Sequence, residues 1–191
     1  FCFVWHSKAQ QIETTCDFFV VDGLGNVLSV EGNQLVKFDQ NGNKIAEFSN
    51  AVYGDISSVD GSNPFKILVF FADMSTVVFL DQYLAPVSEF IDLYETTNFE
   101  ATKVCLSKSN DIWVYESTNQ TLNKLDNNHK VSIQSQNLSS LIKRKPFQII
   151  EENDRVFMIC PDNILVFDTF GTYLQKLPIK SDSRIQVIDK I

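Results

Sequence analysis

The sequence predicts an all-β chain of repeated four-stranded antiparallel sheets, and two observations lead to that prediction. A strand-turn-strand segment, first met as Leu35-Val-Lys-Phe-Asp39-Gln-Asn-Gly42, returns three more times along the 191 residues. The aspartates that end its first strand recur about 42 to 45 residues apart, which is the period of one four-stranded β-propeller blade. These repeat-turn aspartates are Asp39, Asp81, Asp126 and Asp168.

Each unit shows the same order of strands when it is read around its aspartate. Short apolar inner strands are predicted at residues 18–22, 56–60, 102–106 and 147–151, and second strands at 26–30, 66–71, 111–115 and 155–160. Gly, Asn, Asp, Ser and Pro occupy the connections, where they supply turn conformations. The predicted blades therefore cover residues 16–50, 51–95, 99–140 and 145–180.

Residues 181–191 have the pattern of the first strand of a fifth blade, with no second strand behind it. Four blades close into a ring if this last strand completes the first blade, since rings of 4–8 blades occur. The other interpretation, which we prefer, is that the chain is a fragment of a larger ring.

The composition favours a folded chain made of strands. Hydrophobic residues form 44% of the sequence, and 16 residues are Phe. Phe and β-branched residues favour strands because they fit a pleated, half-buried surface. No helical period of apolar residues is found, apart from a short turn near residues 138–143. No apolar run approaches the length of a membrane-spanning helix, so no transmembrane segment is expected.

The first nine residues have the features of the end of a secretory signal peptide. An apolar stretch precedes Ser7-Lys8-Ala9, which places small residues at the −3 and −1 positions of a cleavage site. A short buried first strand is the alternative interpretation. On the signal interpretation, residues 10–191 form the propeller domain.

The turn sequences resemble those of a known class of repeat protein. The residues that carry the resemblance are Asp22-Gly-Leu-Gly-Asn26, the segment from Leu35 to Gly42, and Asp168-Thr-Phe-Gly171. Through them, residues 16–191 resemble exported β-propellers of Bacteroidota envelopes, and more distantly the NHL-type and two-component-regulator propellers. The Trp-Asp dipeptide of WD blades and the double glycine of kelch blades are absent from the sequence. The resemblance implies a β-propeller fold, and it assigns no functional residue to this sequence.

Histidine and phosphate-binding motifs are weak. Of the two histidines, His6 lies in the predicted signal and His129 lies in the turn at residues 126–130. We interpret His129 as an ordinary turn residue, which leaves no basis for a catalytic triad or a histidine-based zinc site. Gly23-Leu-Gly25 stands between two strands and has no following helix, so it is not a phosphate-binding loop.

Three cysteines remain after the predicted signal, which contains Cys2. Cys16, Cys105 and Cys160 show no CxxC spacing, so neither a metal site nor a redox motif is expected. Cys105 and Cys160 fall in predicted strands, where we expect small buried hydrophobic side chains. The sequence leaves the disulfide state of these three cysteines open.

Carboxylates offer the one enzymatic alternative. The loop that starts at Asp39 has oxygen ligands at its first, third and fifth positions, but its twelfth residue is Asn50 rather than a bidentate glutamate. A hairpin turn, in which the aspartate accepts amide hydrogen bonds, is therefore preferred. Acids near the inner-strand ends form a channel cluster on the alternative hypothesis and are solvated turn residues on the preferred one. These acids are Asp22, Asp55, Asp60, Glu151 and Asp154.

The charge favours some partners over others. The net charge of −8 disfavours binding to nucleic acid or to an anionic membrane surface. A protein or a glycan of the cell envelope is the expected partner, and no cofactor or metal is expected. Aromatic residues in predicted loops are candidate partner contacts, with packing between blades as the alternative. These candidates are Tyr53, Tyr83, Tyr94 and Phe99.

Two functional hypotheses follow from the sequence. The first is a non-catalytic interaction scaffold or binding module in the periplasm or at the outer membrane. The second is a calcium-dependent propeller hydrolase or lyase with carboxylates lining the central channel. The sequence leaves the oligomeric state open.

Overall fold

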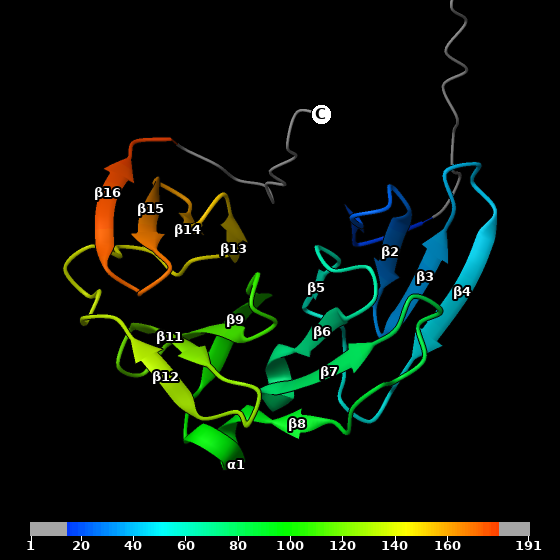
Figure 1. Ribbon diagram of the computed structural model, residues 1–191, viewed down its shortest axis with the longest axis horizontal. Helices are drawn as coiled ribbons and strands as arrows, with labels where there is room; N and C mark the ends of the chain where they lie inside the picture. Colours follow the sequence, from blue (N-terminus) through cyan, green and yellow to red (C-terminus); the bar gives the residue numbers. More distant parts are fainter. Residues whose placement is uncertain (1–14, 180–191) are drawn as a thin grey trace, which may run out of the picture.

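The computed structural model describes residues 15–179, which form four four-stranded antiparallel sheets in the order of the sequence (Figure 1). The predicted all-β, bladed architecture is confirmed. Blade 1 contains β1 (Phe18–Val21), β2 (Val27–Glu31), β3 (Gln34–Phe38) and β4 (Lys44–Ser49), and blade 2 contains β5 (Ser58–Asp60), β6 (Ile67–Phe71), β7 (Thr76–Leu80) and β8 (Ile91–Asp92). Blade 3 contains β9 (Ala101–Leu106), β10 (Ile112–Glu116), β11 (Thr121–Leu125) and β12 (Val131–Gln134), and blade 4 contains β13 (Gln148–Glu152), β14 (Arg155–Cys160), β15 (Asn163–Asp168) and β16 (Tyr173–Leu177).

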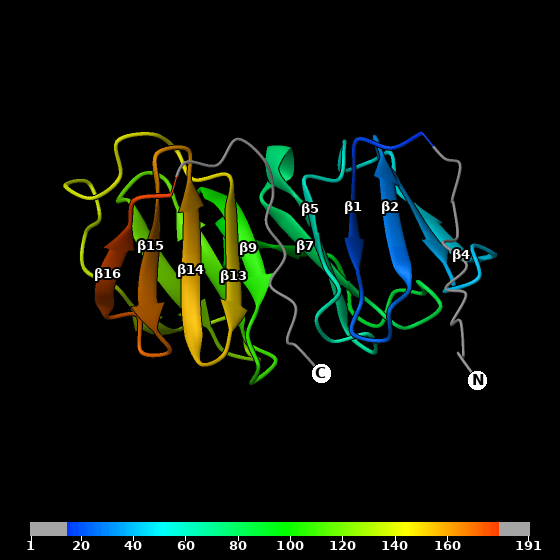
Figure 2. The ribbon, with the colours of Figure 1, turned by 90° about the horizontal axis from the view of Figure 1, so that it is seen from above.

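The blades stand side by side in an open arc, with β1, β5, β9 and β13 toward its centre. Seen from above, the first and last blades lie apart (Figure 2). The predicted signal at residues 1–9 and the predicted fifth-blade strand at residues 181–191 lie outside the described residues. No helix within residues 15–179 has the length and apolar character needed to span a membrane.

Alternation along the strands builds the three cores between blades. In β6, Ile67, Val69 and Phe71 belong to the core against blade 1, whereas Leu68 and Phe70 belong to the core against blade 3. Successive strand side chains point to opposite faces of a sheet, so one apolar run supplies both interfaces. β10 does the same with Ile112 and Val114 toward blade 2 and Trp113 and Tyr115 toward blade 4.

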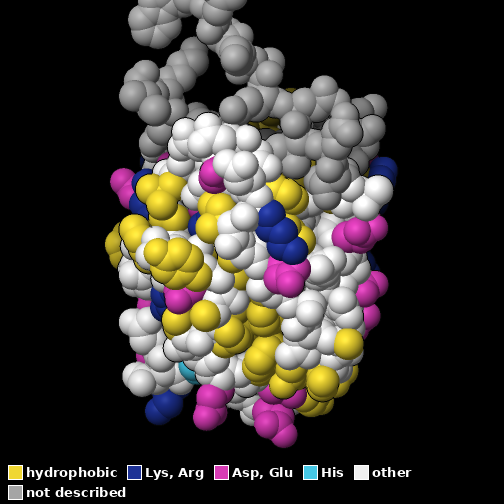
Figure 3. Space-filling view, turned by 90° about the vertical axis from the view of Figure 1, so that its right-hand side faces the viewer, with side chains coloured by type: hydrophobic (Ala, Val, Ile, Leu, Met, Phe, Trp, Pro, Cys, Tyr) yellow, Lys and Arg dark blue, Asp and Glu magenta, His cyan; other side chains and the backbone are white. Residues whose placement is uncertain are grey.

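The end blades each have one face without a neighbouring blade among the described residues. On blade 1 this face carries the positions that alternate with the core, among them Phe19, which is exposed. Figure 3 views the molecule from the blade 1 side, where hydrophobic side chains gather on the surface. Exposed large hydrophobic residues of blade 1 and the loop after it include Ile45 and Val52.

Blade 2 departs from the predicted pattern at its outer edge. Its fourth strand, β8, has only two residues, and the chain then turns into the short helix α1 (Leu93–Thr97). The sequence shows no helical period of apolar residues here, so α1 was not predicted. Asp92 caps α1 by accepting hydrogen bonds from the backbone N–H groups of Tyr94 and Glu95, and Leu93 is buried. A helix of five residues is too short to produce a periodic apolar pattern.

Candidate functional site

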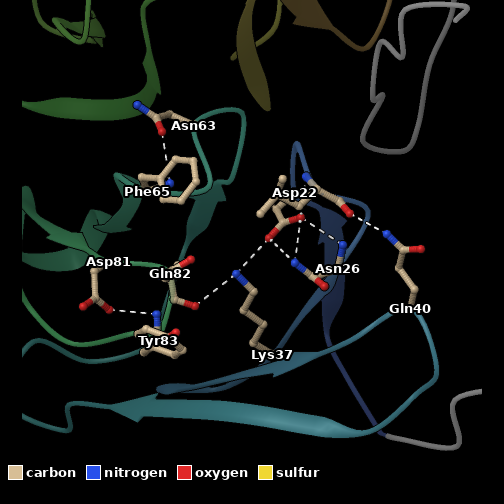
Figure 4. A network of polar contacts seen from close by, with 10 residues as sticks. Asp22, Asn26, Lys37, Gln40, Asn63, Phe65, Asp81, Gln82 and Tyr83 are labelled. Carbon is tan, nitrogen blue, oxygen red and sulfur yellow. Dashed lines mark hydrogen bonds and ion pairs between the residues drawn. The ribbon is translucent and has the colours of Figure 1, made fainter.

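The acid at the end of the first inner strand is part of a buried ion pair. Asp22 Oδ2 lies 2.9 Å from Lys37 Nζ, and both side chains are almost fully buried. The carboxylate also accepts hydrogen bonds from the backbone N–H groups of Leu24 and Asn26 and from the Asn26 side chain. Lys37 Nζ donates onward to the carbonyl of Gln82 in blade 2, at 3.1 Å (Figure 4). Asp22 therefore joins blade 1 to blade 2 through Lys37.

The pKa of Asp22 is lowered by these contacts. Burial by itself raises the pKa of a carboxyl, but the hydrogen bonds from Lys37, Asn26 and the backbone favour the charged form and outweigh it. Asp22 thus remains ionised at neutral pH.

The equivalent acids of blades 2 and 4 also join neighbouring blades. Asp60 accepts a hydrogen bond from the backbone N–H of Leu106 in blade 3, at 2.8 Å. Glu151 of blade 4 accepts one from the backbone N–H of Lys108 and a very short one from Trp113 Nε1, both in blade 3. N–H groups of blade 3 therefore donate hydrogen bonds to both carboxylates across the blade interfaces.

The other two inner-strand acids, Asp55 and Asp154, are exposed. Within residues 15–179 no group of three or more His, Cys, Asp or Glu side chains is placed to hold a metal ion. The inner-strand acids are thus spread over separate blade interfaces and exposed turns.

The repeat-turn aspartates make the same two hydrogen bonds in all four blades. In blade 1, Asp39 Oδ1 accepts hydrogen bonds from the backbone N–H groups of Asn41 and Asn43, at 2.8 Å each. The same two bonds, to the second and fourth residues after the aspartate, are made by Asp81, Asp126 and Asp168. This geometry places the third residue after each aspartate in the left-handed backbone region.

The residue at that third position differs between blades, and in blades 2, 3 and 4 it lies at an interface between blades. It is Gly42 in blade 1 and Gly171 in blade 4, but Leu84 in blade 2 and His129 in blade 3. Leu84 is buried in the core between blades 1 and 2. A side chain at Gly171 would meet Ile133 of β12, so blade 4 approaches blade 3 closely there. His129, half-buried, lies at the interface between blades 2 and 3.

At this interface lies a cavity of about 760 Å³, which we call the blade 2/3 groove. Its volume falls within the range of roughly 300–1,000 Å³ that is usual for small-molecule sites. Blade 2 contributes the β5–β6 turn, the loop before β8 and α1, and blade 3 contributes the turns before β10 and after β11. Because β8 is so short, the usual outer strand does not cover this part of blade 2. The side chains used below are Phe65, Lys66, Phe79, Glu89, Glu95, Asn110 and His129.

Two basic groups line the groove. Lys66 Nζ donates a hydrogen bond to the carbonyl of Asn110 at 3.1 Å and lies 4.3 Å from the ring centroid of Phe79. Burial lowers the pKa of Lys66, although the charge of Asp111 opposes the change. Burial also lowers the pKa of His129, against the charge of Asp126, so its imidazole is neutral at pH 7. Phe65 lines the same groove with 62% of its surface exposed.

The four aromatic candidates divide into two groups. Tyr83 and Tyr94 have 64% and 57% of their surface exposed, and both belong to the outer part of blade 2. Tyr53 stacks on Phe90, with ring centroids 4.4 Å apart, and packs against the core between blades 1 and 2. Phe99 packs against the core between blades 2 and 3. Of the four, Tyr83 and Tyr94 are therefore the exposed ones.

The three cysteines of the described chain are free thiols. Cys16 is exposed, whereas Cys105 and Cys160 are buried in the core between blades 3 and 4. Burial raises the pKa of both buried thiols, that of Cys160 to about 11. The buried thiols are therefore protonated and poorly nucleophilic at neutral pH.

Sequence reasoning missed the groove. His129 was interpreted as an ordinary turn residue, and Lys66 was not singled out. One signal was present, because aligning the four repeat turns places a histidine and a leucine where two other blades have glycine. A non-glycine residue at a left-handed position is uncommon and points to a role for its side chain.

Comparison with known proteins shows similarity at the level of the fold. No protein-family model matches the chain, and no curated protein matches it. A streptogramin B lyase structure matches with a TM-score of 0.62 and 16% identity, over 86% of this chain and 54% of that chain. A protein of unknown function from Bacteroides caccae matches with a TM-score of 0.62 and 10% identity, over 85% of this chain and 60% of that one.

The extracellular domain of a putative hybrid two-component system from B. thetaiotaomicron matches with a TM-score of 0.56 and 12% identity, over 78% of this chain and 21% of that one. The chain thus spans 54% and 60% of the length of the first two structures. The expected resemblance to distant β-propeller repeat proteins is confirmed, and at these identities the likeness shows the fold alone.

Proposed function

We propose that the chain is a non-catalytic binding module of an exported, envelope-located propeller, and that it binds a protein or glycan partner. The observation that carries this proposal is the blade 2/3 groove, which combines an exposed aromatic ring, Phe65, with the polar groups of Lys66, Asn110 and His129. Concave sites with apolar walls and a few placed polar groups are the usual form of a ligand site. Tyr83 and Tyr94 extend the proposed contact surface on blade 2.

The location in the periplasm or at the outer membrane is part of the same proposal. It is supported by the signal-like residues 1–9 and by the structural likeness to an extracellular domain from a Bacteroides species.

A calcium-dependent hydrolase or lyase is the alternative function. The likeness to a lyase is one of fold, and Asp22, Asp60 and Glu151 accept hydrogen bonds from donors of the protein. These contacts favour a structural role for the inner-strand acids and support the binding proposal.

The proposal is tested by screening the 191-residue protein against immobilised envelope oligosaccharides and peptides, and then measuring Kd and the shift in Tm for each hit. A ligand at 100 times its Kd stabilises the folded state by about 2.7 kcal/mol, which is readily measured. Phe65→Ala should weaken binding about 10-fold or more, since it removes a large apolar contact. Mass spectrometry should recover the ligand unchanged.

Phe170→Ala is the matched control, because Phe170 is 75% exposed in the repeat turn of blade 4, outside the groove. Equal affinity of the Phe65→Ala variant and the parent protein for the ligand would contradict binding in the blade 2/3 groove. Conversion of a bound ligand into product would contradict the non-catalytic assignment.

A further inference from the structure

Lys66 is a half-buried cation without an ion-pair partner among residues 15–179. Its ammonium group has three N–H bonds, of which one is directed to the carbonyl of Asn110, and its other close neighbour is the face of Phe79. The nearby carboxylate of Asp111 is paired with Lys124, at 3.5 Å. The charge of Asp111 acts on Lys66 from beyond ion-pair distance, so this half-buried ammonium group has lost water without gaining an ion pair. Such a group favours an anion beside it.

His129 lies in the same groove and supplies a second nitrogen donor. Its imidazole makes no hydrogen bond within the described chain, and it is close enough to Lys66 for the lysine charge to lower its pKa. The left-handed backbone at His129 costs free energy that the glycine of the equivalent turns avoids. The two basic side chains therefore line the cavity with N–H groups that have no acceptor in the described chain.

The carboxylates that line the groove are either already bound or exposed. Asp92 accepts hydrogen bonds from the backbone N–H groups of Tyr94 and Glu95 in α1, and Asp126 accepts two from the backbone of its own turn. Glu89 and Glu95 are exposed, so water screens their charge, and their carboxylate oxygens are acceptors suited to hydroxyl groups of a ligand. The groove thus offers donors for an anion, acceptors for hydroxyls and the open ring of Phe65.

The shape of blade 2 argues against a peptide added as an extra strand. Peptides that bind at a sheet edge need a run of free backbone groups on the outermost strand. In blade 2 the outermost strand is β8, which has two residues before α1 begins. A compact polyhydroxylated ligand fits a cavity of about 760 Å³ without needing that edge.

On this basis, and resting on the proposed binding function, we infer that the blade 2/3 groove recognises a uronic acid residue of an acidic glycan. The sugar carboxylate lies at Lys66 and His129, a pyranose ring lies against Phe65, and ring hydroxyls donate to Glu89 and Glu95.

The test measures binding of a short oligogalacturonate and of the same oligosaccharide with its carboxyl groups reduced to hydroxymethyl groups, by calorimetry with the 191-residue protein. The acidic form should bind about 10- to 100-fold more tightly than the reduced form, the range expected for one charge-assisted contact. Lys66→Met should remove this difference while its methylene stem still covers Phe79, and Lys66→Arg should keep it.

Lys143→Met is the matched control, because it removes the same charge from an exposed loop outside the groove. Loss of the preference in both Met variants would assign it to the overall charge and overturn the inference. Equal binding of the acidic and reduced sugars would overturn carboxylate recognition and leave the glycan-binding function in place. Binding of neither sugar would overturn the inference, and the peptide screen would then decide the proposed function.

Discussion

Single side chains hold the blades of this protein together at the ends of the inner strands. Asp22, Asp60 and Glu151 occupy similar places in their blades, yet each uses a different set of donors. A buried ion pair such as Asp22 with Lys37 contributes little net stability compared with apolar residues of the same size, but loss of one partner leaves a buried charge and is costly. Its main role here is to place Lys37 against the carbonyl of Gln82 in the next blade.

The lowered pKa of Asp22 predicts an acid-dependent loss of stability. The unfolded carboxyl titrates near 3.8 and the folded one below that value, so the stabilisation is complete above pH 3.8. As the pH falls below 3.8 the unfolded chain takes up the proton first, and the stabilisation is lost as the pH passes through the folded pKa. This carboxyl adds up to about 1.4 kcal/mol per pH unit to the slope of the free energy of unfolding.

Urea unfolding between pH 5 and pH 2 should therefore show a smaller loss of stability in the double variant Asp22→Asn/Lys37→Met than in the parent. Glu47→Gln/Lys44→Met is the matched control, because it removes an exposed ion pair of the same blade. If the parent and the Asp22→Asn/Lys37→Met protein lose stability in parallel, Asp22 does not titrate as described.

At the scale of the elements, the hairpins were predictable and the groove was not. The turn at Asp39 depends on residues within five positions of one another, so its geometry is visible in a local pattern. The groove depends on how blade 2 meets blade 3, and residues far apart in the sequence, such as Lys66 and His129, line it together. The contacts of Asp22, Asp60 and Glu151 were not predictable for the same reason, because they involve groups of a neighbouring blade.

Substitution by glycine at the third residue after the repeat-turn aspartate should have opposite effects on stability in blades 2 and 3. Leu84→Gly removes a buried side chain and should lower the free energy of unfolding by about 2–4 kcal/mol, after relief of the left-handed backbone is included. His129→Gly removes a half-buried side chain that makes no hydrogen bond in the described chain. Because glycine adopts the left-handed backbone at lower cost, this change should raise the free energy of unfolding by up to about 1 kcal/mol. Chemical denaturation of both variants checks the pair. A clear destabilisation by His129→Gly would show that the imidazole is needed for packing.

The whole molecule is a row of sheets in which each blade contacts only its neighbours. Blades 2 and 3 are covered on both faces, whereas blades 1 and 4 each have a face with no neighbouring blade in the described chain. The similar solved structures are longer than this chain, which agrees with an open arc. In such arrays stability is set by each unit and by its interfaces with adjacent units.

Native-state hydrogen exchange should be slower in the two middle blades than in the two end blades. Backbone amides of β6, β7, β10 and β11 should exchange most slowly, because both faces of these strands are buried. Amides of β4 and β16, at outer edges of the end blades, should exchange faster. Uniform protection across all four blades would indicate a single cooperative unit instead.

The two buried thiols allow opening of the interface between blades 3 and 4 to be followed by chemical modification. Cys105 and Cys160 come from different blades and share one core, whereas Cys16 is exposed. An alkylating reagent modifies Cys16 directly but reaches the other two only when that core opens. The rate at which Cys105 and Cys160 are modified therefore measures how often blade 4 separates from blade 3, without any engineered cysteine.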